Sequence, residues 1–206
     1  MFKDRKDAGR KLAEKLANYR GKDTVVLALP RGGVVVGYEV AKALGAPLDI
    51  VVVRKVGHPE NPEYAVCTVD ERGELLCNES ARALVPENWI VEEAKRQTKE
   101  ARRRLLLYRG EKKPADIAGR VVILVDDGIA TGLSMRLAIR SLKARRPKKI
   151  IVAAPVASME AVQEIQTEGA EEILVLLPPE EFAGAVGAHF QNFTQVEDEE
   201  VIKLLA

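Results

Sequence analysis

The chain has 206 residues, 47% hydrophobic and 31% charged, and its 32 Lys and Arg nearly cancel its 31 Asp and Glu, leaving a formal charge of +1. This composition excludes a disordered chain and argues against nucleic-acid binding driven by bulk charge, while the two cysteines exclude a disulfide scaffold or a cysteine-rich zinc site. No apolar run approaches the roughly 18 residues of a membrane span, so we expect a cytoplasmic protein with one α/β domain and no membrane partner.

Residues 3–20 predict an amphipathic helix, and apolar β-branched runs then alternate with helical patterns. The expected strands are 24–30, 49–54, 120–127, 149–157 and 172–178, each nearly continuous in Val, Ile, Leu and Ala. The expected crossover helices are 34–44, 134–145 and 159–168. This alternation predicts an α/β fold with a doubly wound, mostly parallel sheet.

Two further segments break the alternation. Residues 64–77 alternate around an Asp-Glu-Arg-Gly turn and predict a β-hairpin. Its flanking cysteines, Cys67 and Cys77, are expected to be reduced packing thiols, with a disulfide open if the source is a hyperthermophile. Residues 88–109 predict a long charged helix with a narrow stripe that is a candidate dimer surface. The stripe consists of Val91, Ala94, Thr98, Ala101, Leu105 and Tyr108.

The strongest chemical signal is the segment VVILVDDGIATGLS at 121–134. An apolar strand ends in Asp126 and Asp127, and a turn with Thr131 and Gly132 opens the next helix. Backbone N–H groups at such a turn suit a phosphate, and the two carboxylates suit sugar hydroxyls or magnesium. The alternative is that both acids only cap the helix and complement its dipole.

This motif resembles the phosphoribosyl-pyrophosphate (PRPP) signature of type I phosphoribosyltransferases. The resemblance implies that Asp126 and Asp127 hold the ribose hydroxyls, with any metal contact indirect. It also implies that the loop after them binds the 5′-phosphate. The loop residues are Ala130, Thr131, Gly132, Leu133 and Ser134.

The motif departs from the family pattern at two positions, Gly128 and Leu133, where a bulky apolar residue and a small residue are usual. At Ala130, relatives that act on hypoxanthine and guanine typically carry an Asp. Ala130 therefore disfavours 6-oxopurine chemistry.

After the first expected sheet strand, Pro30-Arg31-Gly32-Gly33 offers a cation and bare amides at a helix start. A simple glycine-rich turn is the alternative. The resemblance implies that Arg31, Gly32 and Gly33 bind pyrophosphate, that the Pro30–Arg31 peptide bond is cis, and that Arg31 is catalytic.

The second expected strand ends in Arg54 and Lys55, followed by His58. In the family a mobile catalytic loop lies here and brings cations to the leaving pyrophosphate, so Arg54 and Lys55 are further catalytic candidates. His58 sits where some relatives have Lys, although a lone His is more often incidental. The alternative for all three is a solvated charged loop.

The resemblance covers the whole chain and implies one phosphoribosyltransferase-like domain, with a core at about 21–178 and an inserted hairpin and helix at 56–112. A hood for the acceptor base would come from residues 1–20 and 178–206. Aromatic residues of the tail could stack on that base or serve as ordinary packing, and packing is the interpretation that we favour. They are Phe182, His189, Phe190 and Phe193.

The leading hypothesis is a Mg²⁺-dependent enzyme that transfers the phosphoribosyl group from PRPP to an unknown nitrogenous base, or the reverse, and that forms a homodimer. The chain most resembles a subgroup whose acceptor is unassigned. The alternative is a non-catalytic PRPP- or nucleotide-binding regulator with the same fold, although no basic face or helix-turn-helix for nucleic acid is evident. A nucleotide-binding dehydrogenase is disfavoured because no G-x-G-x-x-G follows the first sheet strand.

Overall fold

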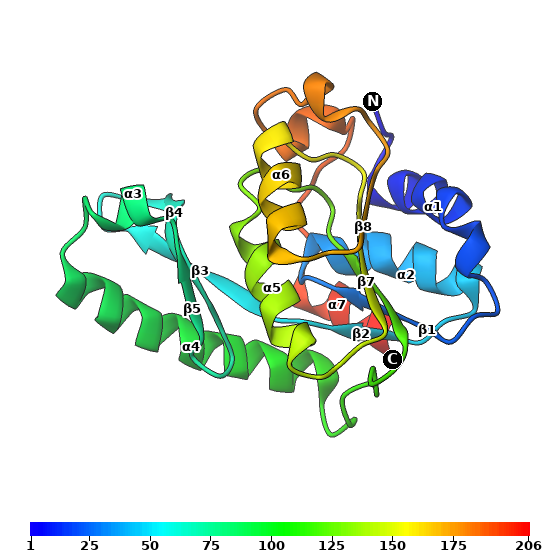
Figure 1. Cartoon of the computed structure of the whole chain (residues 1–206), viewed down its shortest axis with the longest axis horizontal. Coiled ribbons are helices and arrows are strands. Elements are labelled where there is room, and N and C mark those ends of the chain that lie inside the picture. Colours follow the sequence, from blue (N-terminus) through cyan, green and yellow to red (C-terminus); the bar gives the residue numbers. More distant parts are fainter.

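The computed structural model describes residues 1–206 with the exception of the Glu63 side chain. A five-stranded parallel sheet forms its centre, and the strand order is β2-β1-β6-β7-β8 (Figure 1). The strands are β1 (Thr24–Ala28), β2 (Leu48–Ile50), β6 (Val121–Val125), β7 (Lys149–Ala154) and β8 (Glu172–Val175). The predicted α/β fold with a doubly wound parallel sheet is confirmed.

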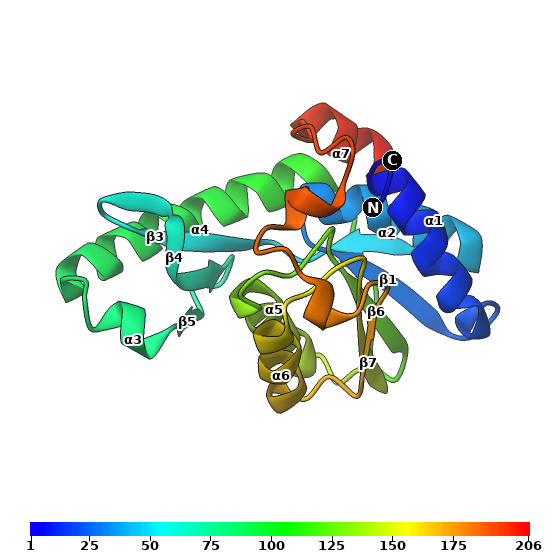
Figure 2. The ribbon, with the colours of Figure 1, turned by 90° about the horizontal axis from the view of Figure 1, so that it is seen from above.

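Helices cover both faces of this sheet, as Figure 2 shows. On one face α2 (Gly32–Leu44) packs on the strands and α1 (Arg5–Lys15) packs on α2. On the other face lie α5 (Leu133–Lys143) and α6 (Met159–Glu168). Strand residues such as Val26 and Leu27 are fully buried because each face of the sheet meets a helix layer.

A second, three-stranded antiparallel sheet projects from the first (Figure 1). It consists of β3 (Val53–His58), β4 (Asn61–Asp70) and β5 (Leu75–Cys77), and α4 (Glu87–Arg109) packs against it after the short α3 (Glu79–Arg82). The prediction of one strand over 49–54 was wrong. The pairing with β1 ends at Ile50, and from Val53 onward the chain pairs with β4 instead.

The two cysteines form a disulfide, so the expectation of reduced thiols was wrong. Cys67 of β4 lies directly opposite Cys77 of β5, with 3.9 Å between their Cα atoms. The alternating pattern around Asp70–Gly73 indicated the β4–β5 turn. It did not fix which residues of the two strands lie opposite each other, because this depends on how the strands pair in the folded chain.

The residues that α4 buries differ from the apolar stripe predicted from the sequence. Val91 is 42% exposed, whereas Ile90 and Glu93 are buried. Ala101 and Tyr108 are buried within the chain, so this stripe is internal packing and not a free dimer surface.

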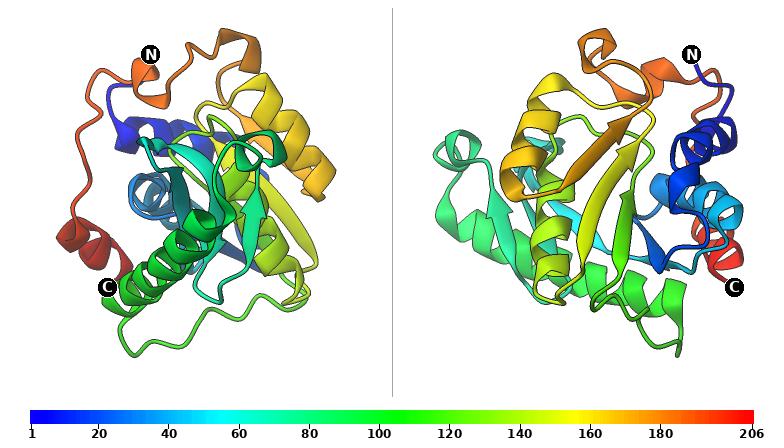
Figure 3. Two further views of the ribbon diagram at one scale, coloured as in Figure 1. Left: turned by 90° about the vertical axis from the view of Figure 1, so that its left-hand side faces the viewer. Right: turned by 45° about the vertical axis from the view of Figure 1, so that its right-hand side comes forward.

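The two ends of the chain pack together. Phe2 forms a β-bridge with Phe190, and the N-terminal segment runs beside the tail (Figure 3). The tail contains two 3₁₀ turns, Pro179–Glu181 and Val186–His189, and ends in α7 (Asp198–Leu205); a third such turn, Ala17–Tyr19, follows α1. The tail aromatics pack on one another and on Phe2, as the packing interpretation expects.

Among the described residues, none of the helices combines the length and apolar character that crossing a bilayer requires.

Gly9 provides a test of the packing between α1 and α2. A Cβ at this position would lie 2.8 Å from the Glu39 Cβ and 2.9 Å from the Val36 carbonyl oxygen, and a backbone atom cannot move aside cheaply. We expect Gly9→Val to lower the free energy of unfolding by about 2 kcal/mol in urea denaturation. Arg10→Val, on the exposed face of the same helix, controls for the β-branched cost and should have an effect below about 1 kcal/mol. Equal losses would contradict the close approach.

Candidate functional site

The candidate site lies where the chain order of the central sheet reverses, between β1 and β6. The next strand after β1 pairs on one side of it, whereas β6 pairs on the other. Ala28 is in register with Val125, so the Pro30–Gly33 turn and the Asp126–Asp127 pair leave the sheet side by side. Open α/β sheets bind ligands at such switch points, beyond the carboxyl ends of the strands.

Asp127 is bound by a residue that the sequence analysis did not single out. Arg5, in the first turn of α1, donates from Nε to Asp127 Oδ2 at 2.6 Å. Its guanidinium also donates to the Thr194 carbonyl and lies 3.8 Å from the centre of the Phe193 ring. Asp127 is therefore held by an ion pair that spans 122 positions of sequence, and no local pattern could indicate it.

Asp126 is in a different environment from its neighbour. Its Oδ1 accepts a hydrogen bond from the backbone N–H of Asp127 at 2.8 Å. Burial, together with repulsion from the Asp127 carboxylate, raises the pKa of Asp126 well above the ordinary value of 3.8. The two acids therefore differ: Asp127 is paired with Arg5, whereas Asp126 is biased towards its protonated form.

The Pro30–Gly33 turn packs directly on these acids. A Cβ on Gly32 would lie 1.8 Å from Asp127 Oδ2, and one on Gly33 would lie 2.9 Å from Asp126 Oδ1. Both glycines are thus required for the close approach of this turn to the carboxylates. The Pro30–Arg31 bond is cis, which agrees with the implication of the family resemblance.

The loop after the acids is fixed by its neighbours and ends in an uncapped helix. Ile129 N–H donates to the Val156 carbonyl at 2.9 Å, and Ser158 Oγ donates to the Ala130 carbonyl at 2.6 Å. Gly132 is the N-cap of α5 with φ of +74°, and no side chain caps the helix. The first-turn N–H groups have no partner four residues earlier in the helix, an arrangement that favours an anion.

The departure at Gly128 has a structural explanation. A Cβ there would lie 2.3 Å from Val186 Cγ1. The tail therefore occupies the space that a bulky residue of the usual motif would need.

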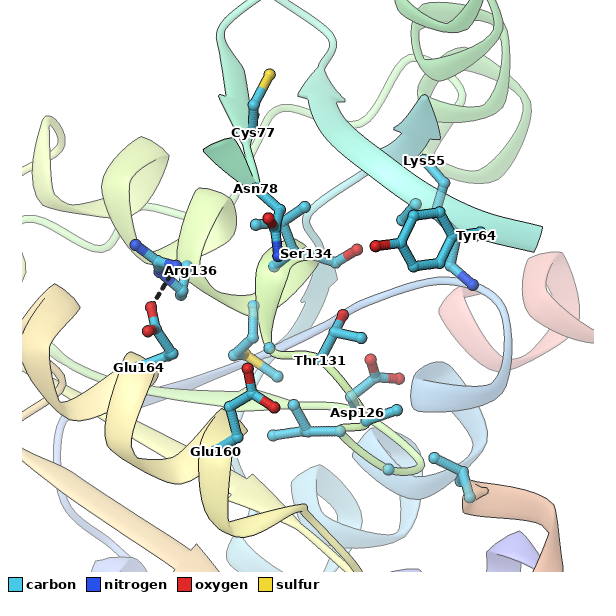
Figure 4. Close-up of a pocket in the computed structure, with 18 of the residues that line it drawn as sticks. Lys55, Tyr64, Cys77, Asn78, Asp126, Thr131, Ser134, Arg136, Glu160 and Glu164 are labelled. Atoms are coloured by element: carbon cyan, nitrogen blue, oxygen red, sulfur yellow. Dashed lines mark ion pairs between the residues drawn. The ribbon is translucent and has the colours of Figure 1, made fainter. Parts of the chain in front are cut away.

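A cavity of about 710 Å³ unites most of the predicted site. Its walls contain Asp126, Asp127 and the entire 128–134 loop, and Lys55 and Tyr64 of the second sheet reach it from the opposite side (Figure 4). Glu160 and Glu164 of α6 form a further wall, and Glu164 pairs with Arg136.

A second cavity of about 490 Å³ adjoins the first and shares Lys55, Asp126 and Ser134 with it. Arg54 and His58 line it. The segment 54–58 belongs to β3, and the His58 Nδ1 accepts a hydrogen bond from the Glu60 N–H within the exposed β3–β4 turn. The structure thus brings Lys55 to the acids and places Arg54 along the same strand.

Arg31 takes a different direction from the other predicted cations. Its Nη1 lies 3.4 Å from Asp198 Oδ1 and 3.9 Å from Glu197 Oε2, at the start of α7. Tyr108 also donates to Asp198, at 2.6 Å. Burial and this hydrogen bond raise the pKa of Tyr108 to about 12, so its hydroxyl stays protonated at neutral pH. Arg31 is therefore held by the C-terminal helix in this structure.

Comparison with known proteins adds an independent line of evidence. The family model described as "Phosphoribosyl transferase domain" matches residues 2–171. The protein named "Putative phosphoribosyl transferase Rv0571c" of Mycobacterium tuberculosis is 40% identical over 207 residues, as is its counterpart in a second strain. The match covers 100% of this chain and 46% of the relative, so the chain spans about half the length of these curated relatives.

A solved structure agrees with the whole fold. The crystal structure of TT1426 from Thermus thermophilus superposes with a TM-score of 0.79 at 46% sequence identity. The superposition covers 99% of this chain and 97% of the other.

The Asp126 environment predicts a measurable effect on stability. Because its folded-state pKa is raised, the contribution of Asp126 is most favourable below about 3.8 and is lost as the pH rises through its folded-state pKa. We expect Asp126→Asn to raise the free energy of unfolding by about 1 kcal/mol at pH 7, with the gain vanishing towards pH 3. Asp116→Asn, at an exposed position, should show no such trend. A pH-independent loss in Asp126→Asn would contradict the assignment.

Proposed function

Because the chain belongs to the phosphoribosyl transferase domain family, we propose that it transfers the 5-phosphoribosyl group from PRPP to a nitrogenous acceptor, or catalyses the reverse reaction. The observation that carries this proposal is the single cavity that unites two carboxylates, an uncapped helix start and Lys55. These are groups for a sugar diol, a phosphate and a departing anion, respectively.

The acids and the loop divide the donor between them. Asp126 and Asp127 accept hydrogen bonds from the ribose 2′ and 3′ hydroxyls, while the 130–134 loop holds the 5′-phosphate. The hydrogen bond from Arg5 orients the Asp127 carboxyl group, which favours its role as an acceptor. The Thr131 and Ser134 hydroxyls add donors for the phosphate oxygens.

Cations stabilise the pyrophosphate end. Displacement at ribose C1 leaves positive charge on the sugar and negative charge on the leaving group, so fixed cations lower the barrier. Lys55 borders both cavities and Arg54 lines the second, which suits them to this end. Arg31 contributes to the same stabilisation by leaving Asp198 and binding the pyrophosphate instead.

The residues fit Mg²⁺ as an ion held mainly by the substrate. Among the described residues no group of three or more metal-ligating side chains is present, and one of the two acids already pairs with Arg5. Mg²⁺ commonly combines one or two carboxylates with substrate phosphates and water. When bound, it neutralises charge on the departing pyrophosphate.

We further propose that residues 1–206 act as one phosphoribosyltransferase-like domain that forms a homodimer in the cytoplasm. The core at 21–178 holds the donor, the 56–112 insertion covers it, and the chain ends form the hood. The packing of Val186 against Gly128 brings this hood to the edge of the donor cavity and supports the division.

Calorimetric titration with PRPP, with and without Mg²⁺, tests the donor site. We expect micromolar, Mg²⁺-dependent binding that is lost in Asp127→Asn, since an amide loses the ion pair with Arg5 and one acceptor oxygen, but kept in the exposed control Asp116→Asn. Absence of binding in the unmodified protein would reject the proposal. Binding without pyrophosphate release, across a panel of bases, would support the regulatory alternative.

Substitution of Arg31 tests whether this residue acts in turnover and not in binding of the 5′-phosphate. We expect Arg31→Ala to lower kcat by about 100-fold, because one charge contact to the leaving group is lost, with ribose 5-phosphate affinity changed less than about threefold. Arg10→Ala, at an exposed position on α1, is the control. An unchanged kcat would remove Arg31 from the catalytic assignment.

A further inference from the structure

The second cavity has one wall from the antiparallel sheet and the other from α4. Trp89, Glu93, Arg96 and Gln97 of α4 face Arg54 of β3 across it. Trp89 Nε1 donates to the Gly57 carbonyl at 3.2 Å, which ties the helix to the end of β3.

Arg54 has a neutral side-chain partner. Its Nε donates to Gln97 Oε1 at 3.1 Å, and among the described side chains no carboxylate forms an ion pair with it. Arg145 likewise has no carboxylate partner and donates to the Ala115 carbonyl, but several other partly buried arginines pair with acids. These pairs are Arg5–Asp127, Arg104–Glu100 and Arg109–Asp49.

Burying the Arg54 guanidinium without an ion-pair partner has an energetic cost. Burial and the nearby Arg104 charge lower the pKa of Arg54, although a guanidinium remains protonated at neutral pH. A partly buried cation held by a neutral amide retains its attraction for an anion, whereas a carboxylate at the same place would compete with that anion.

Glu93 determines how the Gln97 amide is turned. Glu93 is 7% exposed and accepts hydrogen bonds from Gln97 Nε2 at 2.8 Å and from Arg96 Nη2 at 2.7 Å. An ionised carboxylate only accepts, so the NH₂ group of Gln97 must face Glu93 and its oxygen must face Arg54. Arg96 balances the charge of Glu93. The other nearby acid, Glu100, attracts Arg54 but is itself paired with Arg103 and Arg104.

We propose that Gln97, oriented by Glu93, is a positioning residue that holds Arg54 as a cation without an ion-pair partner, available to the diphosphate end of the donor. This inference rests on the proposed function. It assigns to α4 a part in donor recognition that depends on the neutrality of residue 97 as well as on its hydrogen bond.

The test compares two substitutions of Gln97. If the residue acted only by its hydrogen bond to Arg54, these two variants would differ in diphosphate binding. Gln97→Met removes the hydrogen bond to Arg54, whereas Gln97→Glu keeps an acceptor there but neutralises the cation. We expect each variant to bind inorganic diphosphate with Mg²⁺ about tenfold more weakly by calorimetry, with ribose 5-phosphate affinity unchanged. Gln166→Met and Gln166→Glu, at an exposed position of α6, are matched controls that should bind both ligands normally.

A double-mutant cycle shows whether Gln97 acts through Arg54. Arg54→Met should weaken diphosphate binding at least as much, and adding Gln97→Met to it should cause no further loss. Wild-type-like diphosphate binding by Gln97→Glu, additive losses in the cycle, or equal losses for ribose 5-phosphate would each overturn the inference alone. Failure of the unmodified chain to bind either diphosphate or PRPP would overturn the proposed function and this inference together.

Discussion

Two adjacent carboxylates end the central strand of the sheet, and much of the site follows from the need to compensate them where water is partly excluded. Arg5 pairs with Asp127, while burial and repulsion bias Asp126 towards its protonated form. Gly32 and Gly33 leave room for the carboxylates to lie against the turn after β1. The ion pair with Arg5 also joins the N-terminal helix and the tail aromatics to the sheet edge, so the chain ends are part of the site.

The second sheet and α4 form the opposite wall. Lys55 and Arg54 are consecutive residues of β3, and successive side chains of a strand point to opposite faces. Lys55 borders both cavities, whereas Arg54 lines the second and is held by α4 through Gln97. The disulfide and the Trp89 contact join β3, β4, β5 and α4 into one unit that carries these cations.

Most of the fold could be predicted from local pattern. The central strands are rich in Val, Ile, Leu and Ala because helices cover both faces of the sheet. The helix after Asp127 was indicated by its Gly-Ile-Ala-Thr-Gly turn. The wrong predictions concern segments whose local pattern is compatible with more than one packing partner. Residues 49–54 are apolar through most of their length, and nothing in them shows that the chain changes sheets after Ile50. Helical periodicity likewise grouped Val91 with Ala101 and Tyr108 in one candidate dimer surface, whereas only Val91 of these three is exposed.

The sequence by itself determined the alternation of strands and helices, the position of the two acids after a strand, and the loop that starts the next helix. These depend on side chains within a few residues of one another. Only the tertiary structure decided that Arg5 reaches Asp127, that Arg31 lies on Asp198 and Arg54 on Gln97, and that Cys67 meets Cys77. Such partners are brought together by strand register and helix packing, which depend on the whole chain, so no short-range pattern can encode them.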